Sequence, residues 1–102
     1  MDLIAGKFPK TVASAVEILF ADMSFRDRTK IANMNEVELI QFHKSYGHYI
    51  RTEFRLPGNE LLMDSCRNHS GLTDINAMQA SYVILKLLWE KTRDSGALRV
   101  IK

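Results

Sequence analysis

The sequence has little cysteine: Cys66 is the only one among 102 residues. A lone cysteine cannot form an internal disulfide, and small secreted domains of this length usually depend on several. This scarcity favours a reducing compartment, so we expect a cytoplasmic protein. The start of the chain agrees, because an acid, Asp2, stands where a secretory signal carries a base, and no apolar run of signal length precedes Pro9.

Long hydrophobic runs and charge of one sign are also scarce. The densest apolar segment, Tyr82 to Trp89, contains Lys86 and is far shorter than the ~20 residues of a membrane-spanning helix. Lysine and arginine number 14 against 12 acidic residues, a formal net charge of +2. So small an excess gives little attraction to nucleic acid or to an anionic surface. We therefore expect no membrane partner, and nucleic acid is not favoured.

Strict alternation of apolar and polar residues, which is typical of half-buried strands, is hard to find. Apolar residues recur instead at spacings of three and four, which favours helices. The hydrophobic share is 46% and the charged share 25%, both ordinary for one globular domain. The sequence therefore predicts an all-α fold: a compact single-domain bundle of about five helices over residues 1–102, with 1–8 and 97–102 loosely ordered.

Capping and breaking residues predict where the helices begin and end. Ser24 and Asn35 can each cap a helix, and Glu38 stands in the capping-box position after Asn35. Pro57 ends the third helix, and Gly58 can adopt a positive φ in the turn that follows. The helices expected from these signals cover 10–23, 25–33, 35–54, 60–67 and 75–94.

The last two predicted helices have signals of their own. Asn59 can cap the fourth helix, after which 68–73 reads as a polar loop. Asp74 can cap the fifth, and Ser95-Gly96 ends it. Residues with small or apolar side chains cover most of the fifth helix, so we expect it at the centre of the bundle, packed on the first and third, with Trp89 buried. These residues are Met78, Ala80, Ser81, Ile84, Leu85, Leu87, Leu88 and Trp89.

The polar face of the helix expected at 35–54 is also its basic face. At 100° per residue, its polar side chains fall within a sector of about 120°. We interpret it either as a solvated surface or as a face that contacts a partner or an anion. The candidate interaction residues are Lys44, His48, Arg51 and Arg55.

His43 lies in a different sector of that helix, with Ile40 and Ile50, and should point toward the core. A buried imidazole needs hydrogen-bond partners, so we predict a polar anchor between His43 and Asn59 or a main-chain carbonyl near Leu56. Gly47, one turn from His43, costs about 1 kcal/mol of helix propensity relative to Ala, which suggests that another helix packs closely there.

No pattern indicates catalysis, a metal or a cofactor. Cys66 and His69 have the spacing of half a zinc site, but no second pair completes it, and His43 and His48 project from different faces. No family signature surrounds Cys66 as a nucleophile, and no glycine-rich phosphate loop occurs. We therefore assign no catalytic residue, metal ligand or cofactor.

Several positions resemble a family of small helical bacterial proteins known only as a domain of unknown function. The similarity runs from near Asp22 to Arg93 and implies a compact helical fold in a bacterial cytosol, without an activity or substrate. It rests on Ile31-Ala32-Asn33-Met34, Leu39-Ile40, His43, Gly47, Ile50-Arg51, Phe54, Leu56, Gly58-Asn59, Leu62, Cys66, Asp74 and Leu88-Trp89.

These observations favour a non-catalytic protein–protein interaction or regulatory module, whose partner is another protein or a second copy of the chain. One alternative is a nucleic-acid-associated protein that uses the basic face, and a second is a small enzyme. An interaction module should keep an exposed apolar patch once the core is assigned. The residues expected to supply it are Leu61, Leu62 or Tyr49, or the tail residues Leu98 and Val100.

Overall fold

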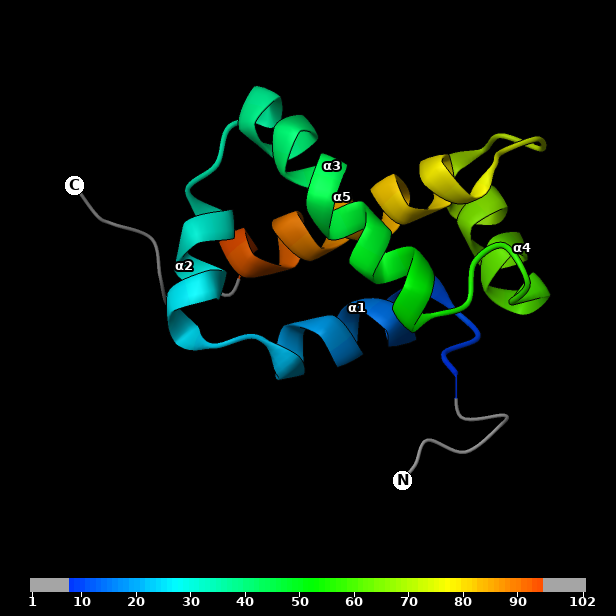
Figure 1. The fold of residues 1–102 in the computed structure, drawn as a ribbon, viewed down its shortest axis with the longest axis horizontal. Helices are drawn as coiled ribbons and strands as arrows, with labels where there is room; N and C mark the ends of the chain where they lie inside the picture. Colours follow the sequence, from blue (N-terminus) through cyan, green and yellow to red (C-terminus); the bar gives the residue numbers. More distant parts are fainter. Residues whose placement is uncertain (1–7, 95–102) are drawn as a thin grey trace.

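A computed structural model describes residues 8–94, and within that range the chain forms helices and no strands. The predicted all-α fold is confirmed. The expected helix end at Ser95-Gly96 and the C-terminal tail lie outside the described residues. The helices are α1 (Val12–Asp22), α2 (Phe25–Ala32), α3 (Glu36–Glu53), α4 (Glu60–Ser70) and α5 (Ala77–Asp94) (Figure 1).

Side-chain caps fix the starts of α2 and α3 as predicted. Ser24 Oγ accepts from the Asp27 amide at 3.1 Å. Asn35 and Glu38 form the expected capping box, in which each side chain accepts from the other residue's amide at 2.8 Å. Each such bond pairs an amide that would otherwise lack a partner in the first turn, so both boundaries could be found from the sequence.

The predicted boundaries around the loop between α4 and α5 are wrong. Helix α4 continues to Ser70, where Gly71 ends it in the left-handed conformation at φ 80°. Helix α5 begins at Ala77 because Asn76, rather than Asp74, caps it. The Asn76 side chain accepts from the Gln79 amide at 2.8 Å, and the Gln79 side chain accepts from the Asn76 amide at 2.9 Å.

The turn after α3 also differs from the prediction. Gly58 does not take the positive φ; Arg55 takes it, at 61°. The peptide bond between Leu56 and Pro57 is cis. Asn59 then caps α4, as predicted, by accepting from the Leu62 amide at 3.2 Å.

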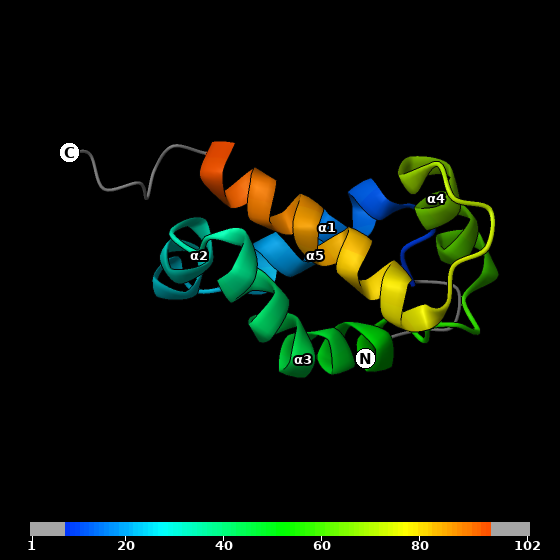
Figure 2. The ribbon, with the colours of Figure 1, turned by 90° about the horizontal axis from the view of Figure 1, so that it is seen from above.

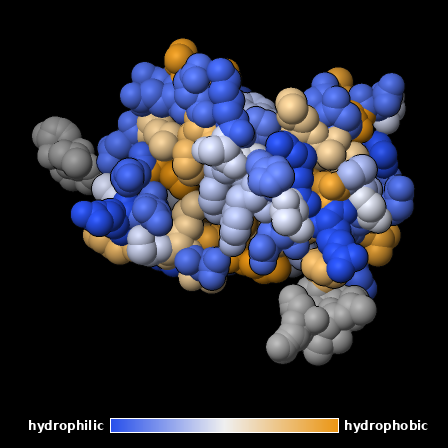
Figure 3. All heavy atoms as spheres, in the orientation of Figure 1, coloured by the Kyte–Doolittle hydropathy of each residue, from blue (hydrophilic) through white to orange (hydrophobic). Residues whose placement is uncertain are grey.

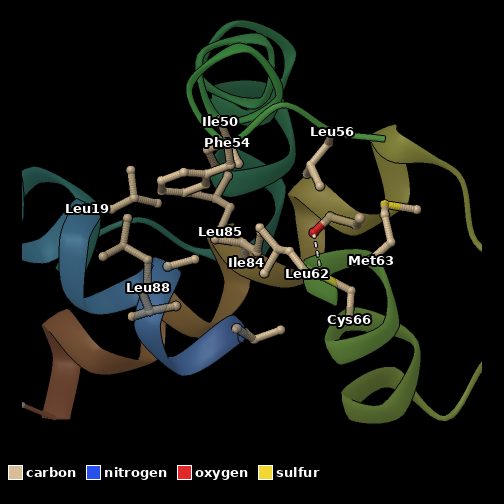
Figure 4. Close-up of a cluster of buried hydrophobic side chains, with 14 of the residues drawn as sticks. Leu19, Ile50, Phe54, Leu56, Leu62, Met63, Cys66, Ile84, Leu85 and Leu88 are labelled. Atoms are coloured by element: carbon tan, nitrogen blue, oxygen red, sulfur yellow. Dashed lines mark hydrogen bonds between the residues drawn. The ribbon is translucent and has the colours of Figure 1, made fainter. Parts of the chain in front are cut away.

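Helix α5 is central, as predicted. It packs against each of α1 to α4, whereas among the other helices extensive contacts join only α1 and α4 (Figures 1 and 2). Ile84, Leu85 and Leu88 of α5 are fully buried. Ile50 of α3 and Phe54, which directly follows α3, point toward them in Figure 4. The core therefore forms around α5.

Three apolar side chains expected to face the core are less buried than predicted. Ile40 and Met78 are exposed, and Trp89 is only half-buried. The Trp89 indole N–H needs a polar partner and donates to the Met34 carbonyl at 3.0 Å, at the link between α2 and α3. Ile40 and Met78 instead line a groove described below.

Candidate functional site

Ser81 of α5 is the point at which two side chains of α3 converge. Its Oγ lies 2.8 Å from His43 Nε2 and 2.9 Å from Arg51 Nη1, and the Ser81 side chain is fully buried. The same hydroxyl donates to the Met78 carbonyl at 2.8 Å. A serine hydroxyl has one proton, so Oγ accepts from Arg51 and from a proton on His43 Nε2. We call His43, Arg51 and Ser81 the Ser81 clamp.

Gly47 makes room for the Ser81 clamp. A Cβ atom at this position would lie 2.6 Å from both Cδ2 and Nε2 of His43, and 3.0 Å from Nη1 of Arg51. His43, Gly47 and Arg51 follow one another at four-residue spacing, so they drift only about 40° per step around α3. The sequence predicted close packing of another helix at Gly47, but the three atoms nearest such a Cβ belong to side chains of α3 itself.

The environment of His43 favours its neutral form. Burial, and after it the positive charge of Arg51, lower the pKa of His43 from its ordinary value of 6.5. The imidazole ring stands edge-on to Tyr82, with 5.3 Å between the ring centroids. The partners predicted for His43, Asn59 or a carbonyl near Leu56, are wrong, because the imidazole reaches across to α5.

Asn59 anchors a different part of the molecule. Its amide nitrogen donates to the Pro9 carbonyl at 2.9 Å and to the Phe54 carbonyl at 3.2 Å. Together with its cap on α4, these bonds join the segment before α1, the end of α3 and the start of α4. Asn59 and His43 therefore belong to two separate polar clusters.

An apolar groove of about 400 Å³ lies beside the Ser81 clamp, between α3 and the start of α5. The loop before α5 contributes Leu72 and Ile75. The Tyr82 hydroxyl is buried and has no hydrogen-bond partner within residues 8–94. The lining residues, which we call the α3–α5 groove, are Ile40, His43, Leu72, Ile75, Met78, Gln79, Tyr82 and Val83.

Three large apolar side chains of the α3–α5 groove remain in contact with solvent. Ile40 is 47% exposed, Leu72 54% and Met78 59%. Sequence reasoning missed this patch, since its members come from three segments that only the fold brings together. The signal in the sequence that could have indicated this patch is the presence of two apolar residues, Leu72 and Ile75, in the otherwise polar loop between α4 and α5.

The patch residues predicted from the sequence are distributed differently. Leu61 and Tyr49 are exposed, but Leu62 is fully buried in the core, so its assignment to the surface is wrong. Leu98 and Val100 lie outside the described residues.

The four predicted interaction residues do not form one continuous face. Lys44 and His48 are exposed on α3. The side chain of Arg51 points inward and donates to Ser81. Arg51 stands at the edge of the polar sector, so its long side chain can reach α5. Arg55 lies beyond the end of α3, and its guanidinium lies 5.1 Å from the centre of the Phe8 ring.

Neither catalysis by Cys66 nor a metal centre has geometric support. The Cys66 thiol is buried and lies 3.7 Å from the Ala80 carbonyl, to which it donates, and burial raises its pKa to about 11. Residues 8–94 contain no group of three His, Cys, Asp or Glu side chains placed to hold a metal ion. In the same range, no helix combines the length and hydropathy needed to cross a membrane.

The chain was compared with protein families, with curated proteins and with solved structures. Neither the curated proteins nor the solved structures gave a match. Residues 8–92 match the family described as "Domain of unknown function (DUF6794)", a range that includes both the Ser81 clamp and the α3–α5 groove. The resemblance inferred from the sequence is thereby confirmed, and the chain belongs to the DUF6794 family.

Proposed function

We propose that the protein is a non-catalytic interaction module of the bacterial cytoplasm, and that its α3–α5 groove binds the apolar face of an amphipathic helix of a partner protein. The exposure of Ile40, Leu72 and Met78 around one concave surface carries this proposal. Soluble proteins rarely expose contiguous apolar patches, and the patches that they do expose often mark binding sites. The buried free thiol of Cys66 supports the assignment to a reducing compartment.

The shape and charge of the groove indicate the partner's chemistry. Its apolar side chains come from two helices and a loop, an arrangement suited to the apolar stripe of an amphipathic helix. Lys44 is exposed one turn beyond Ile40, on the same side of α3. A helix seated against Ile40 therefore brings its flanking residues near Lys44, which favours a partner with acidic residues beside its apolar stripe.

The Ser81 clamp contributes by fixing α3 relative to α5. Two hydrogen bonds to Ser81 join the helices beside the groove, and Lys86 Nζ pairs with Glu36 Oε2 at 3.3 Å nearer the start of α3. A groove held in shape before binding loses less conformational freedom when the partner arrives. The clamp is thus a positioning element for the interaction surface.

A matched pair of substitutions tests the proposal. Partners captured from bacterial lysate with the tagged protein would be identified, purified and titrated against two variants. Ile40→Glu places a charge in the α3–α5 groove, whereas Leu61→Glu places one at a comparably exposed leucine, 56% exposed, on α4. We expect Ile40→Glu to abolish binding and Leu61→Glu to leave it unchanged, with both variants folded by circular dichroism.

Other occupants of the α3–α5 groove would give different experimental results. A partner that binds both variants equally well would contradict the groove as its site. A dimer in sedimentation that Ile40→Glu dissociates would identify the occupant as a second copy of the chain. Binding to nucleic acid that weakens with salt and with Lys44→Ala would replace the proposal with the nucleic-acid alternative.

A further inference from the structure

A second cavity lies on the opposite side of α3 from the groove, between that helix, α2 and the end of α1. Its volume is about 320 Å³, near the lower end of the range of about 300–1,000 Å³ for small-molecule sites. Hydrophobic side chains reach the surface on the side of the molecule that carries these helices (Figure 3). We call it the aromatic cavity, after Phe42, Tyr46 and Tyr49, which line it.

The aromatic side chains form an ordered wall. Tyr46 stacks on Phe42 with 4.9 Å between ring centroids and 13° between planes, and on Tyr49 with 5.3 Å and 28°. The Tyr49 hydroxyl lies 3.4 Å from Asp22 Oδ2, to which it donates. The stack therefore holds the rings and the phenol oxygens in place without a ligand, which lowers the entropic cost of binding one.

The cavity combines this apolar wall with an excess of negative charge. Ile31, Met34 and Phe42 supply hydrocarbon surface, while Asp22 and Asp27 place two carboxylates at the same cavity against one ammonium, that of Lys30. Burial first, then the neighbouring phenol of Tyr49, and then the carboxylates of Asp22 and Asp27 raise the pKa of Tyr46 above its ordinary value of 10.0. The charged side chains that line the cavity, two carboxylates and one ammonium, thus leave it an excess of negative charge, although the whole chain carries +2.

We propose that the aromatic cavity binds an organic ammonium ion, a short alkyl chain that ends in a protonated amine. An ammonium group has three donors and no acceptor, and carboxylate and phenol oxygens accept from it. The alkyl part would lie against the apolar wall. The carboxylates repel an anionic ligand. An inorganic cation needs several oxygen ligands around it, and the apolar wall supplies too few of them. This site does not depend on the groove or on its proposed partner.

The probe is n-butylammonium chloride, added to isotope-labelled protein and followed by NMR, with n-butanol as the uncharged molecule of similar size. We expect saturable shifts at Phe42, Tyr46 and Tyr49 with the amine, and binding to the alcohol at least about tenfold weaker, because it lacks the charge-assisted hydrogen bond. Equal binding of amine and alcohol, or no saturable binding of the amine, would overturn the proposal.

Substitutions of single residues then test which carboxylate binds the ammonium group. Asp27→Asn should weaken the amine about tenfold and leave the alcohol unchanged, whereas Asp74→Asn, in the loop before α5, should alter neither. Tyr46→Phe keeps the ring stack and tests the phenol oxygen if Asp27→Asn perturbs α2. Amine affinity that survives both variants would contradict the site. Ile40→Glu leaves this cavity intact, so loss of partner binding there with amine binding retained separates the two proposals.

The source of the ammonium group follows from one further comparison. A lysine with both main-chain ends blocked carries the same alkylammonium on a peptide unit. If it binds as tightly as butylammonium, the cavity accepts a lysine side chain of another protein; if it binds at least about tenfold more weakly, the cavity takes a free amine.

Discussion

Replacing Gly47 by Ala perturbs the Ser81 clamp at its tightest point. In an open helix this change stabilises a protein by about 1 kcal/mol, since Ala has the higher helix propensity. At Gly47 the new methyl group would lie 2.6 Å from the His43 ring, which must rotate away. Rotation breaks the hydrogen bond to Ser81, worth about 1 kcal/mol, and the edge contact with Tyr82, worth about 0.5–1.5 kcal/mol.

The balance of these effects predicts a change of sign between two backgrounds. In the parent, Gly47→Ala should destabilise the fold by about 0.5–1.5 kcal/mol, because the lost contacts exceed the gain in propensity. In His43→Ala the obstructing ring is absent, and the same change should stabilise by about 0.5–1 kcal/mol, with Arg51 still close to the methyl group. The coupling energy between the two sites is then about 1–2.5 kcal/mol.

Urea unfolding followed by circular dichroism measures all four proteins of this cycle. His48→Ala serves as the control, because His48 is exposed on α3 away from the clamp. His48→Ala should change the free energy of unfolding by the same amount whether residue 47 is Gly or Ala. Stabilisation by Gly47→Ala of about 1 kcal/mol in both backgrounds would refute the reasoning, since the His43 ring would then not depend on Gly47.

Acidification should destabilise the protein: the folded-state pKa of His43 is lowered, so stability is full above the unfolded value of about 6.5 and falls as the pH drops through and below it. Unfolding midpoints measured against pH should flatten in His43→Gln, and an unchanged profile would clear His43 of this role. Trp89→Ala should cost about 2–3 kcal/mol in urea unfolding, less than the 3–5 of a fully buried tryptophan, and a cost below about 1 would show that its packing contributes little. A thiol reagent at neutral pH should modify Cys66 rapidly in urea and slowly in the native protein, because the thiol is buried with a pKa of about 11; rapid native modification would contradict that burial.

Local signals in the sequence were enough to predict most of the helices. The caps at Ser24, Asn35 and Asn59 act through hydrogen bonds within three residues, so no knowledge of the fold was needed. The start of α5 was mistaken because Asp74 and Asn76 are both good caps. Only the reciprocal bond with Gln79 decides between them.

The candidate site was less accessible to sequence reasoning because it depends on contacts between distant segments. The sequence drew attention to His43, Gly47 and Arg51, but Ser81 appeared only as one small residue of an apolar helix. Its hydroxyl is 38 residues from His43 along the chain, and nothing local relates the two. The groove was missed for the same reason, since Leu72 and Met78 come near Ile40 only when α5 crosses α3.

The central place of α5 has a consequence for how the protein folds during its synthesis. Residues of α1 to α4 leave the ribosome before those of α5, yet their extensive contacts with one another join only α1 and α4. The hydrophobic side chains of α2 and α3 therefore lack their main packing partners until Ile84, Leu85 and Leu88 emerge. We therefore expect these side chains to stay exposed to solvent while α1 to α4 are synthesised, and the core to form only once α5 has followed them.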